Sequence, residues 1–208
     1  MLKLESVAKE YNLRPVLDDI TLSLEQGVSY SLSAANGSGK TTLLQIMCGL
    51  SRPTKGRVLW ENRPLGAKER RYLGVVLQAN FLFGDLTAVE NLSFYGTMYG
   101  MSSPQKRAEE WLQRIGLSYA RSQYVKDFSK GMKQRLTLAR AMIHEPQLLL
   151  LDEPFDGLDE SSSQLFRGLL DETVQAGTTV FLVTHQASEA KAAQRQYTLK
   201  YGRLVDCS

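Results

Sequence analysis

The sequence predicts an α/β domain whose core is a mainly parallel sheet, on three observations. Two apolar runs, Leu148–Leu151 and Val180–Val183, contain no polar position, which is typical of central strands buried on both faces. Helical patterns separate the strand patterns, as in strand–helix–strand crossovers. A glycine-rich segment at 34–42 joins an apolar stretch to a helical pattern. The chain has 208 residues, which is enough for one domain with a sizeable core.

The first part of the chain is predicted to form strands and one helix. Alternating or continuous apolar residues indicate strands at 2–7, 20–24, 28–32, 57–60 and 72–77. Apolar residues at helical spacing after residue 42 predict a helix that reaches Leu50. Pro53 and Gly56 mark the turn that returns the chain from this helix to a strand.

Residues 88–144 differ from the rest because their apolar spacing is helical throughout. Helices are expected from Glu90 to near Gly100, at 104–115 and at 130–144, the last ended by Pro146. Strand patterns return at 147–151, 178–183 and 197–204. We therefore predict a single domain, 1–208, with a core formed by 1–86 and 145–208 and an inserted helical subdomain at about 87–144.

Composition excludes several classes of protein. The net charge is +3, and the densest basic cluster, at 68–71, is interpreted as a solvated face, so no nucleic-acid partner is expected. Two cysteines, Cys48 and Cys207, do not make a disulfide framework. The apolar runs are too short to span a bilayer, and the N-terminus lacks a signal-peptide pattern. We therefore expect the chain to be made in the cytoplasm and to stay there.

The glycine-rich segment has the pattern of a phosphate-binding loop. It reads Ala34, Ala35, Asn36, Gly37, Ser38, Gly39, Lys40, Thr41 and Thr42. Small residues let backbone N–H groups turn inward around a phosphate chain, Lys40 reaches the β- and γ-phosphates, and the Thr41 hydroxyl can bind Mg²⁺. The alternative, an ordinary strand-to-helix turn, gives no reason for a lysine followed by two threonines. The segment therefore predicts a nucleotide-binding P-loop.

Ala34 departs from this pattern, which usually has glycine at its first position. An alanine forced to positive φ would cost about 1–2 kcal/mol. We predict that Ala34 has a negative φ and that the loop keeps its shape, with Lys40 facing the nucleotide.

Acidic and imidazole side chains follow the two apolar strands. Asp152 and Glu153 end the leucine run, and ligands bind at that end of parallel strands. Asp152 is expected to hold Mg²⁺ and Glu153 to polarise the attacking water. A solvated acidic turn is the alternative. His185 follows the second run, and we expect it beside Glu153 in a catalytic role. His144 is given no catalytic role, only a partial positive charge that suits a helix C-terminus.

The order of these motifs resembles the ATP-binding cassette (ABC) ATPases. Residues 128–135, Phe-Ser-Lys-Gly-Met-Lys-Gln-Arg, are similar to that family's signature motif and lie ahead of the Asp-Glu pair, as in the family. The resemblance covers the whole chain. It implies a P-loop NTPase fold with a mainly parallel core sheet, an N-terminal antiparallel β-subdomain and an inserted α-helical subdomain.

The resemblance also implies roles for residues outside the two motifs. Gln78 matches the Q-loop glutamine, at the catalytic centre and the metal, and His185 matches the switch histidine. Asp159 matches the D-loop, and Tyr11 the aromatic residue that stacks on adenine, although such an aromatic is more often part of a core. The expected cofactors are ATP and Mg²⁺, the latter held by Thr41, Gln78 and Asp152.

A second anion-binding end is expected at the signature motif. Ser129 is a good N-cap for a helix that begins at Lys130, and with the Gly131 N–H it can bind a phosphate. The family implies that this end faces the γ-phosphate held by a second copy. Two ATP molecules would then lie between two head-to-tail subunits in an ATP-dependent homodimer, or in a pair with a similar cassette. Lys130 departs from the commonest signature and adds positive charge there.

The family's cassettes mostly drive separate membrane subunits, which implies a peripheral location on the cytoplasmic face of the cell membrane. Aromatic residues and methionine follow Gln78 and continue on the next helix, at Phe81, Phe83, Phe94, Tyr95, Met98 and Tyr99. They suit a groove for a partner's helix, or alternatively pack the helical subdomain.

Three short stretches bear on the branch within the family. Residues 50–60, 86–95 and 184–186 are similar to the ATPase subunit of the haem exporter of cytochrome c biogenesis. ATPases of exporters of drugs, polysaccharides or lipids share much of the sequence in these stretches. A soluble mechanical ATPase would carry two cassettes or a long coiled coil, whereas the interval from Lys40 to Ser129 holds only short helices. A non-hydrolysing regulatory module has only Ala34 in its favour.

Overall fold

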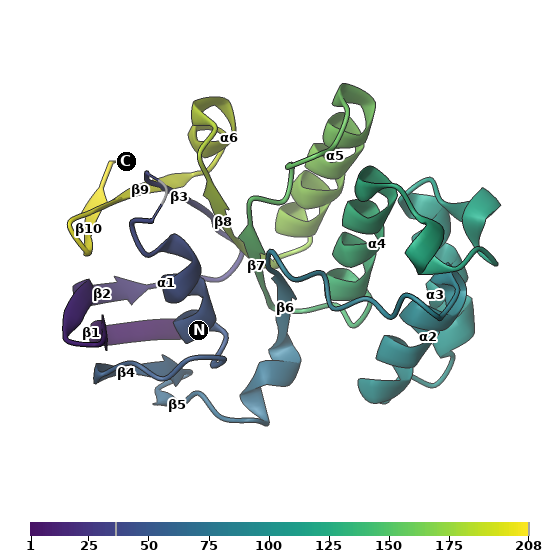
Figure 1. The fold of residues 1–208 in the computed structure, drawn as a ribbon. Helices are drawn as coiled ribbons and strands as arrows, with labels where there is room; N and C mark the ends of the chain where they lie inside the picture. The colour runs from purple at the N-terminus through teal and green to yellow at the C-terminus, as the bar shows by residue number, and fades with distance from the viewer. Residues whose placement is uncertain (36, 208) are drawn as a thin grey trace.

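The structure is a computed structural model that describes residues 1–35 and 37–207. It contains two sheets (Figure 1). The first is antiparallel, in the order β2-β1-β4-β5, and the second has six strands, in the order β10-β9-β3-β8-β7-β6. Strands β9, β3, β8, β7 and β6 of the second sheet are parallel to their neighbours, and β10 is antiparallel to β9. The predicted α/β class with an antiparallel N-terminal sheet is confirmed.

The strands are β1 Leu2–Tyr11, β2 Arg14–Ser23, β3 Ser29–Ser33, β4 Lys55–Trp60, β5 Arg63–Pro64, β6 Leu73–Val76, β7 Leu148–Asp152, β8 Thr179–Thr184, β9 Arg195–Lys200 and β10 Arg203–Asp206. The α-helices are α1 Lys40–Met47, α2 Ala88–Met98, α3 Pro104–Arg114, α4 Lys130–Met142, α5 Glu160–Gln175 and α6 Ala187–Lys191. Short 3₁₀ helices occupy Glu69–Tyr72, Ser118–Ala120 and Val125–Asp127. Among the described residues, no helix is both long and apolar enough to cross a membrane.

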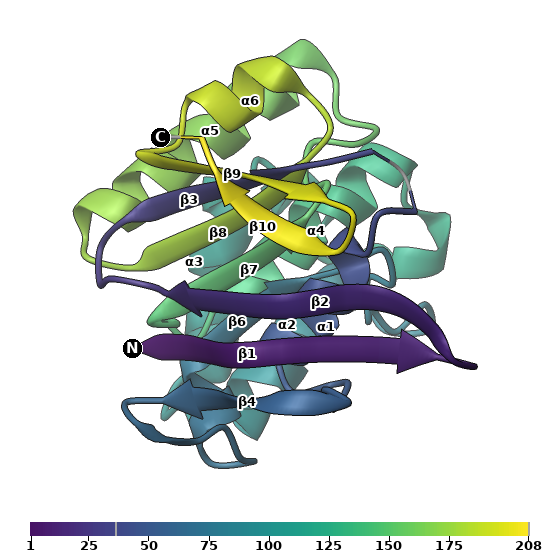
Figure 2. The ribbon, with the colours of Figure 1, turned by 90° about the vertical axis from the view of Figure 1, so that its left-hand side faces the viewer.

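The leucine run of β7 divides the hydrophobic core in two. Leu148 and Leu150 face a cluster formed with α1 and the N-terminal sheet. Leu149 and Leu151 face a second cluster, formed with α2 to α5. All four leucines are fully buried, which confirms that this strand is covered on both faces. In Figure 2 the N-terminal sheet lies in front of the core strands, and α1 lies between the two sheets.

Helix α4 lies directly against the edge strand β6. A side chain at Gly74 would place its Cβ 2.3 Å from the carbonyl oxygen of Ala141 and 2.8 Å from Leu149 Cδ1. Only glycine therefore permits this close approach. The N-terminal half of α4 is partly exposed and its second half, from Leu136, is buried. Helix α2 begins at a capping box in which Thr87 and Glu90 each bond the other's backbone N–H.

The predicted strand at 197–204 is wrong in one respect, because the chain reverses within it. Tyr201 and Gly202 both have positive φ, 51° and 76°, and they form the turn of a hairpin between β9 and β10. Two-residue hairpin turns of this handedness match the twist of the flanking strands. The two N-terminal strands are longer than predicted, since irregular pairing lets β1 continue to Tyr11.

His144 also differs from the expectation that it carries positive charge. Its ring stacks on Tyr99 with a centroid distance of 3.7 Å, and its Nε2 lies 3.1 Å from the Leu73 carbonyl oxygen. Nδ1 is buried without a partner among the described residues. Burial lowers the pKa of His144 to about 4, and the nearby Arg140 guanidinium also acts in that direction. The imidazole is therefore neutral at pH 7.

The neutral His144 predicts a loss of stability in mild acid. Between pH 6.5 and about 4 the unfolded chain binds a proton at this residue and the native chain does not, so the free energy of unfolding falls as pH falls. The shift corresponds to about 3 kcal/mol at its full extent. Urea denaturation at a series of pH values should show this fall in the wild type and a shallower one in His144→Phe. Identical slopes for the two proteins would contradict the assignment, because every other titrating group is common to both.

Candidate active site

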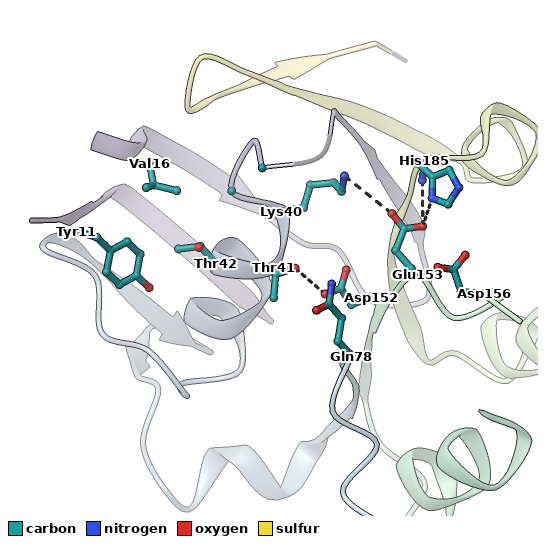
Figure 3. A pocket seen from close by; sticks show the side chains of 12 residues that line it. Tyr11, Val16, Lys40, Thr41, Thr42, Gln78, Asp152, Glu153, Asp156 and His185 are labelled. Atoms are coloured by element: carbon teal, nitrogen blue, oxygen red, sulfur yellow. Dashed lines mark hydrogen bonds and ion pairs between the residues drawn. The ribbon is translucent and has the colours of Figure 1, made fainter. Parts of the chain in front are cut away.

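Three neighbouring parallel strands end at one edge of the core sheet. Ser33 of β3 pairs with Thr184 of β8, and Asp152 of β7 pairs with Val183, so the segments that follow these strands emerge together. They form much of the wall of a cavity of about 560 Å³ (Figure 3). It is lined by Tyr11, Val16, Gly37, Gly39, Lys40, Thr41, Thr42, Gln78, Asp152, Glu153, Asp156 and His185.

The start of α1 forms the anion-binding wall of this cavity. No side chain caps the helix at Gly39, and the first intrahelical bond runs from Leu43 N–H to Gly39, so the preceding N–H groups have no partner within the helix. Gly37 and Gly39 have φ of 75° and 103°, and a Cβ at Gly39 would lie 2.9 Å from Val16 Cγ1. Ser38 Oγ is buried without a partner among the described residues. Free donors at a helix N-terminus fit a phosphate.

Lys40 lies over its own loop. Its ammonium group donates to the carbonyl oxygens of Ala34, at 2.7 Å, and Ala35, at 3.2 Å, and lies 3.9 Å from Glu153 Oε1. Ala34 is not among the residues with positive φ, and its side chain packs against the core cluster around α1. Both observations agree with the predicted backbone of Ala34. Asn36, which the sequence also places in this loop, lies outside the described residues.

Asp152 is buried and hydrogen-bonded to the same helix. The Thr41 hydroxyl donates to Asp152 Oδ2 over 2.8 Å, and the residue is 3% exposed. Burial raises the pKa of this carboxyl group, and the Thr41 hydrogen bond opposes the rise while the Glu153 charge adds to it. A cation bound here would stabilise the carboxylate. Thr41 and Asp152 thus offer two adjacent oxygen ligands of the kind that Mg²⁺ prefers.

Glu153 and His185 form a pair at the opposite wall. Glu153 Oε2 accepts the His185 backbone N–H over 3.1 Å and lies 2.8 Å from His185 Nδ1. This contact requires the proton on Nδ1, which leaves Nε2 available. Glu153 itself has a left-handed backbone, with φ of 47°. The sequence predicted that the two side chains would meet, and they do.

Tyr11 and Gln78 reach the cavity from other elements. Tyr11 ends β1 and is 45% exposed, with Lys9 Nζ 4.9 Å from its ring centroid. Figure 3 shows the ring on the far side of the cavity from His185, where a planar base could stack on it. Gln78 follows β6, and its exposed side chain lies on the Asp152 side of the cavity.

The predicted signature residues lie elsewhere. Ser129 caps α4, with its hydroxyl accepting the Met132 N–H over 3.2 Å, and neither Ser129, Lys130 nor Gly131 lines the cavity. Asp159 likewise caps α5, accepting the Ser162 N–H over 2.7 Å, and these bonds hold the pKa of its carboxyl group below the usual range. One chain therefore brings together the phosphate-loop, acidic and histidine residues but leaves the signature residues apart.

Two groups near the cavity were missed in the sequence. Asp156 lines it, and one oxygen of its carboxylate lies within 4.8 Å of ligand atoms of Glu153 and His185. Its place in the turn after Glu153 was the available signal. Behind His185, the buried Thr184 hydroxyl donates to Glu189 over 2.5 Å and accepts the Gln186 N–H. This pair fixes the segment that carries His185, and no sequence pattern indicated it.

Comparisons with known proteins agree with this geometry. The family model described as ABC transporter matches residues 17–156. The lantibiotic transport ATP-binding protein SrtF of Streptococcus pyogenes is 34% identical over 191 residues, which cover 92% of this chain and 82% of SrtF. The linearmycin resistance ATP-binding protein LnrL of Bacillus subtilis is also 34% identical, and the match covers 92% of this chain and 63% of LnrL, less than two thirds of its length. The ATP-binding cassette MJ0796, solved as a dimer in a post-hydrolysis state with ADP and Pi, superposes on this chain with a TM-score of 0.91 and is 30% identical to it. The superposition covers 100% of this chain and 99% of the MJ0796 chain.

The backbone conformation of Ala34 predicts that glycine at this position would not tighten ATP binding. Because φ is already negative, Ala34→Gly should leave the Kd for ATP unchanged within about twofold. Glycine adds freedom to the unfolded chain, so the free energy of unfolding should fall by about 0.4–1 kcal/mol. Titration with a fluorescent ATP analogue and urea denaturation would measure the two effects. A tenfold tighter Kd would instead show that alanine strains the loop.

Proposed function

The chain belongs to the ABC transporter family as its ATP-binding and ATP-hydrolysing domain, and we propose that it powers export through separate membrane subunits. The observation that carries this proposal is the cavity at the end of β3, β7 and β8. There a free helix N-terminus and Lys40 face Asp152, Glu153 and His185.

The phosphate chain of ATP is bound by the start of α1. The free N–H groups and the helix dipole attract its negative charge. Lys40, which now donates to the carbonyl groups of Ala34 and Ala35, would exchange these contacts for the β- and γ-phosphate oxygens. Ser38 and Thr42 add hydroxyl groups, and Tyr11 stacks on the adenine.

Mg²⁺ fits the buried carboxylate beside Thr41. The Thr41 hydroxyl, Asp152 and Gln78 would hold the ion directly or through water. When bound, it supplies positive charge to the phosphate oxygens. The Thr41 hydroxyl already donates to Asp152 over 2.8 Å, an ordinary hydrogen-bond length, so the two oxygen ligands are adjacent.

Glu153 orients the attacking water. Its Oε2 is engaged by the backbone N–H and the ring of His185, so Oε1, which lies 3.9 Å from Lys40 Nζ, is the atom that would accept a hydrogen bond from that water. His185 fixes the rotation of the carboxylate and presents Nε2 to the γ-phosphate. The pair thus aligns the water instead of supplying a covalent intermediate.

The separate signature residues support a head-to-tail pair of chains. Ser129, Lys130 and Gly131 lie at an exposed helix end, outside the cavity of their own chain. In a homodimer, or in a pair with a similar cassette, this end would bind the γ-phosphate held by the partner, and Asp159 would lie at the interface. Contacts that need the γ-phosphate make the pair ATP-dependent, and hydrolysis releases it.

Two substitutions separate binding from hydrolysis. Glu153→Gln keeps the phosphate site and should bind ATP, form a stable dimer on size-exclusion chromatography and lose at least about 100-fold in turnover. Lys40→Ala should lose both ATP binding and dimer formation, because it removes the charge that reaches the phosphates. Phosphate release and nucleotide titration measure these effects.

The control is Lys106→Ala, which removes an exposed lysine of α3 away from the cavity and should behave as wild type. Turnover that persists in Glu153→Gln would remove Glu153 from the mechanism. An Lys40→Ala chain that still dimerises with ATP would contradict the shared-nucleotide pair.

We propose that the membrane subunit binds at an aromatic groove between α2 and the segment after Gln78. The aromatic groove consists of Leu50, Phe81, Tyr95 and Tyr99, which line a cavity of about 260 Å³, together with the exposed Phe83, Phe94 and Met98. Phe83 packs edge-on against Phe94 at 5.0 Å, and Arg140 lies 5.7 Å from the Phe81 ring, so the surface is ordered. Its members are nevertheless exposed, from 40% at Tyr99 to 67% at Met98, apart from the half-buried Tyr95. An exposed apolar groove fits one helix of a membrane partner, and we propose that the chain binds this partner at the cytoplasmic face of the membrane.

We propose that the cargo is haem, exported for cytochrome c biogenesis. The support is the similarity of residues 50–60, 86–95 and 184–186 to the haem exporter ATPase. Relatives that are 34–36% identical are named for lantibiotic transport, Nod factor export and linearmycin resistance, so export of a drug, polysaccharide or lipid is the second candidate. Purification in mild detergent, followed by identification of the bound membrane protein and small molecule, tests the two. Haem in the complex supports the first candidate, and another cargo replaces it.

The aromatic groove predicts a substitution that uncouples the partner alone. Phe94→Asp combined with Met98→Asp should reduce co-purification of the membrane subunit at least tenfold, because a charge would be buried at the contact. ATP turnover of the isolated chain should not change, since neither residue lines the cavity. Tyr119→Asp, at an aromatic residue that is 76% exposed outside the groove, is the matched control. Equal loss with the control would dismiss the groove as the docking surface.

A further inference from the structure

Helix α4 touches the turn that carries Glu153 at two points. The Gln134 side-chain amide, Nε2, donates to the carbonyl oxygen of Pro154 over 2.8 Å. One turn earlier, the stem of Lys130 lies on the backbone of Gly157, where a Cβ would come within 2.7 Å of Lys130 Cδ and Cε. The first two turns of α4 therefore hold both ends of the segment 154–157.

This segment includes a residue whose backbone needs support. Glu153 has φ of 47°, a conformation that costs a non-glycine residue free energy and persists only where neighbouring structure enforces it. From the sheet, Glu153 N–H donates to the Val183 carbonyl over 2.9 Å. Within the turn, Asp156 N–H donates to the Glu153 carbonyl over 3.2 Å. Gln134 adds a bond from the helical side, at the next residue along the chain.

We propose that Gln134 is a positioning residue for Glu153, which ties the turn at Pro154 to the helix that presents Ser129. The inference rests on the proposed function, because it matters only if Glu153 orients the attacking water. Gln134 does not line the cavity and so does not touch the ATP that its own chain would hold. It acts on the placement of the Glu153 carboxylate relative to the phosphate, through the turn that also carries Asp156.

The link has a further meaning in a pair of chains. Ser129 caps α4 five residues before Gln134, on the same rigid helix. When the Ser129 end binds the nucleotide held by the partner, any movement of α4 would therefore reach Glu153 of the same chain. That Glu153 acts on the nucleotide held by its own chain. Gln134 is then the connection through which closure at one site sets the water-orienting residue at the second.

Gln134→Leu tests the positioning role in the full-length chain. The substitution keeps the volume and removes the donor. We expect kcat for ATP to fall about 10- to 100-fold, as a small misplacement of a reacting group does, while KM and the Kd for a fluorescent ATP analogue change less than twofold. Gln164→Leu is the matched control, because Gln164 is an exposed helical glutamine whose side-chain amide donates to Glu160 of the same helix. It should leave kcat unchanged.

A double-mutant cycle with Glu153→Gln separates positioning from general damage. If Gln134 acts through Glu153, then Gln134→Leu should change the single-turnover rate less than twofold once Glu153 is already glutamine. A further tenfold fall in the double variant would overturn the inference, as would an unchanged kcat in Gln134→Leu beside an active wild type. A parallel rise in KM with loss of thermal stability would also overturn it, because that pattern indicates a structural role. An inactive wild type would refute the proposed function itself, and the inference with it.

Discussion

The parallel pairing of β3, β8 and β7 is the constraint on which the cavity depends. Side chains carried by three segments far apart in sequence meet because the strands end in one row, at Ser33, Thr184 and Asp152. Two separate apolar clusters hold this row of strand ends from the two faces of the sheet, and alternate leucines of β7 belong to one cluster or the other. A slip of one residue would turn those leucines to the wrong cluster and would separate Asp152 from Thr41. Core packing and site geometry are therefore one requirement.

Much of this arrangement could be predicted from the sequence, because its signals are local. A glycine-rich loop before a helix and carboxylates after an apolar run each imply a position on a parallel sheet. The meeting of Glu153 with His185 followed from the strand ends alone. The N-cap at Ser129 was equally local, since a serine before a helix has one preferred use.

The remainder depends on contacts between distant segments that leave no pattern in the chain. The neutral state of His144 arises from Tyr99, Arg140 and the Leu73 carbonyl, which come from other elements. The bond from Gln134 to Pro154 and the pair of Thr184 with Glu189 are of the same kind. The division of the C-terminal segment into β9 and β10 was missed for another reason. The turn needs a positive φ at Tyr201, and tyrosine gives no sequence signal for that conformation. Tertiary packing selected each of these states.

The absence of a side chain at Gly74 affects the position of residues beyond its immediate neighbours. Position 74 carries no reactive group and does not line the cavity, yet it sets the spacing between β6 and α4. A larger residue there would shift the whole helix, whose N-terminal end carries Ser129 and whose C-terminal end precedes His144. A substitution at this one buried glycine would thus move both ends of α4, at Ser129 and near His144, although position 74 itself carries no side chain.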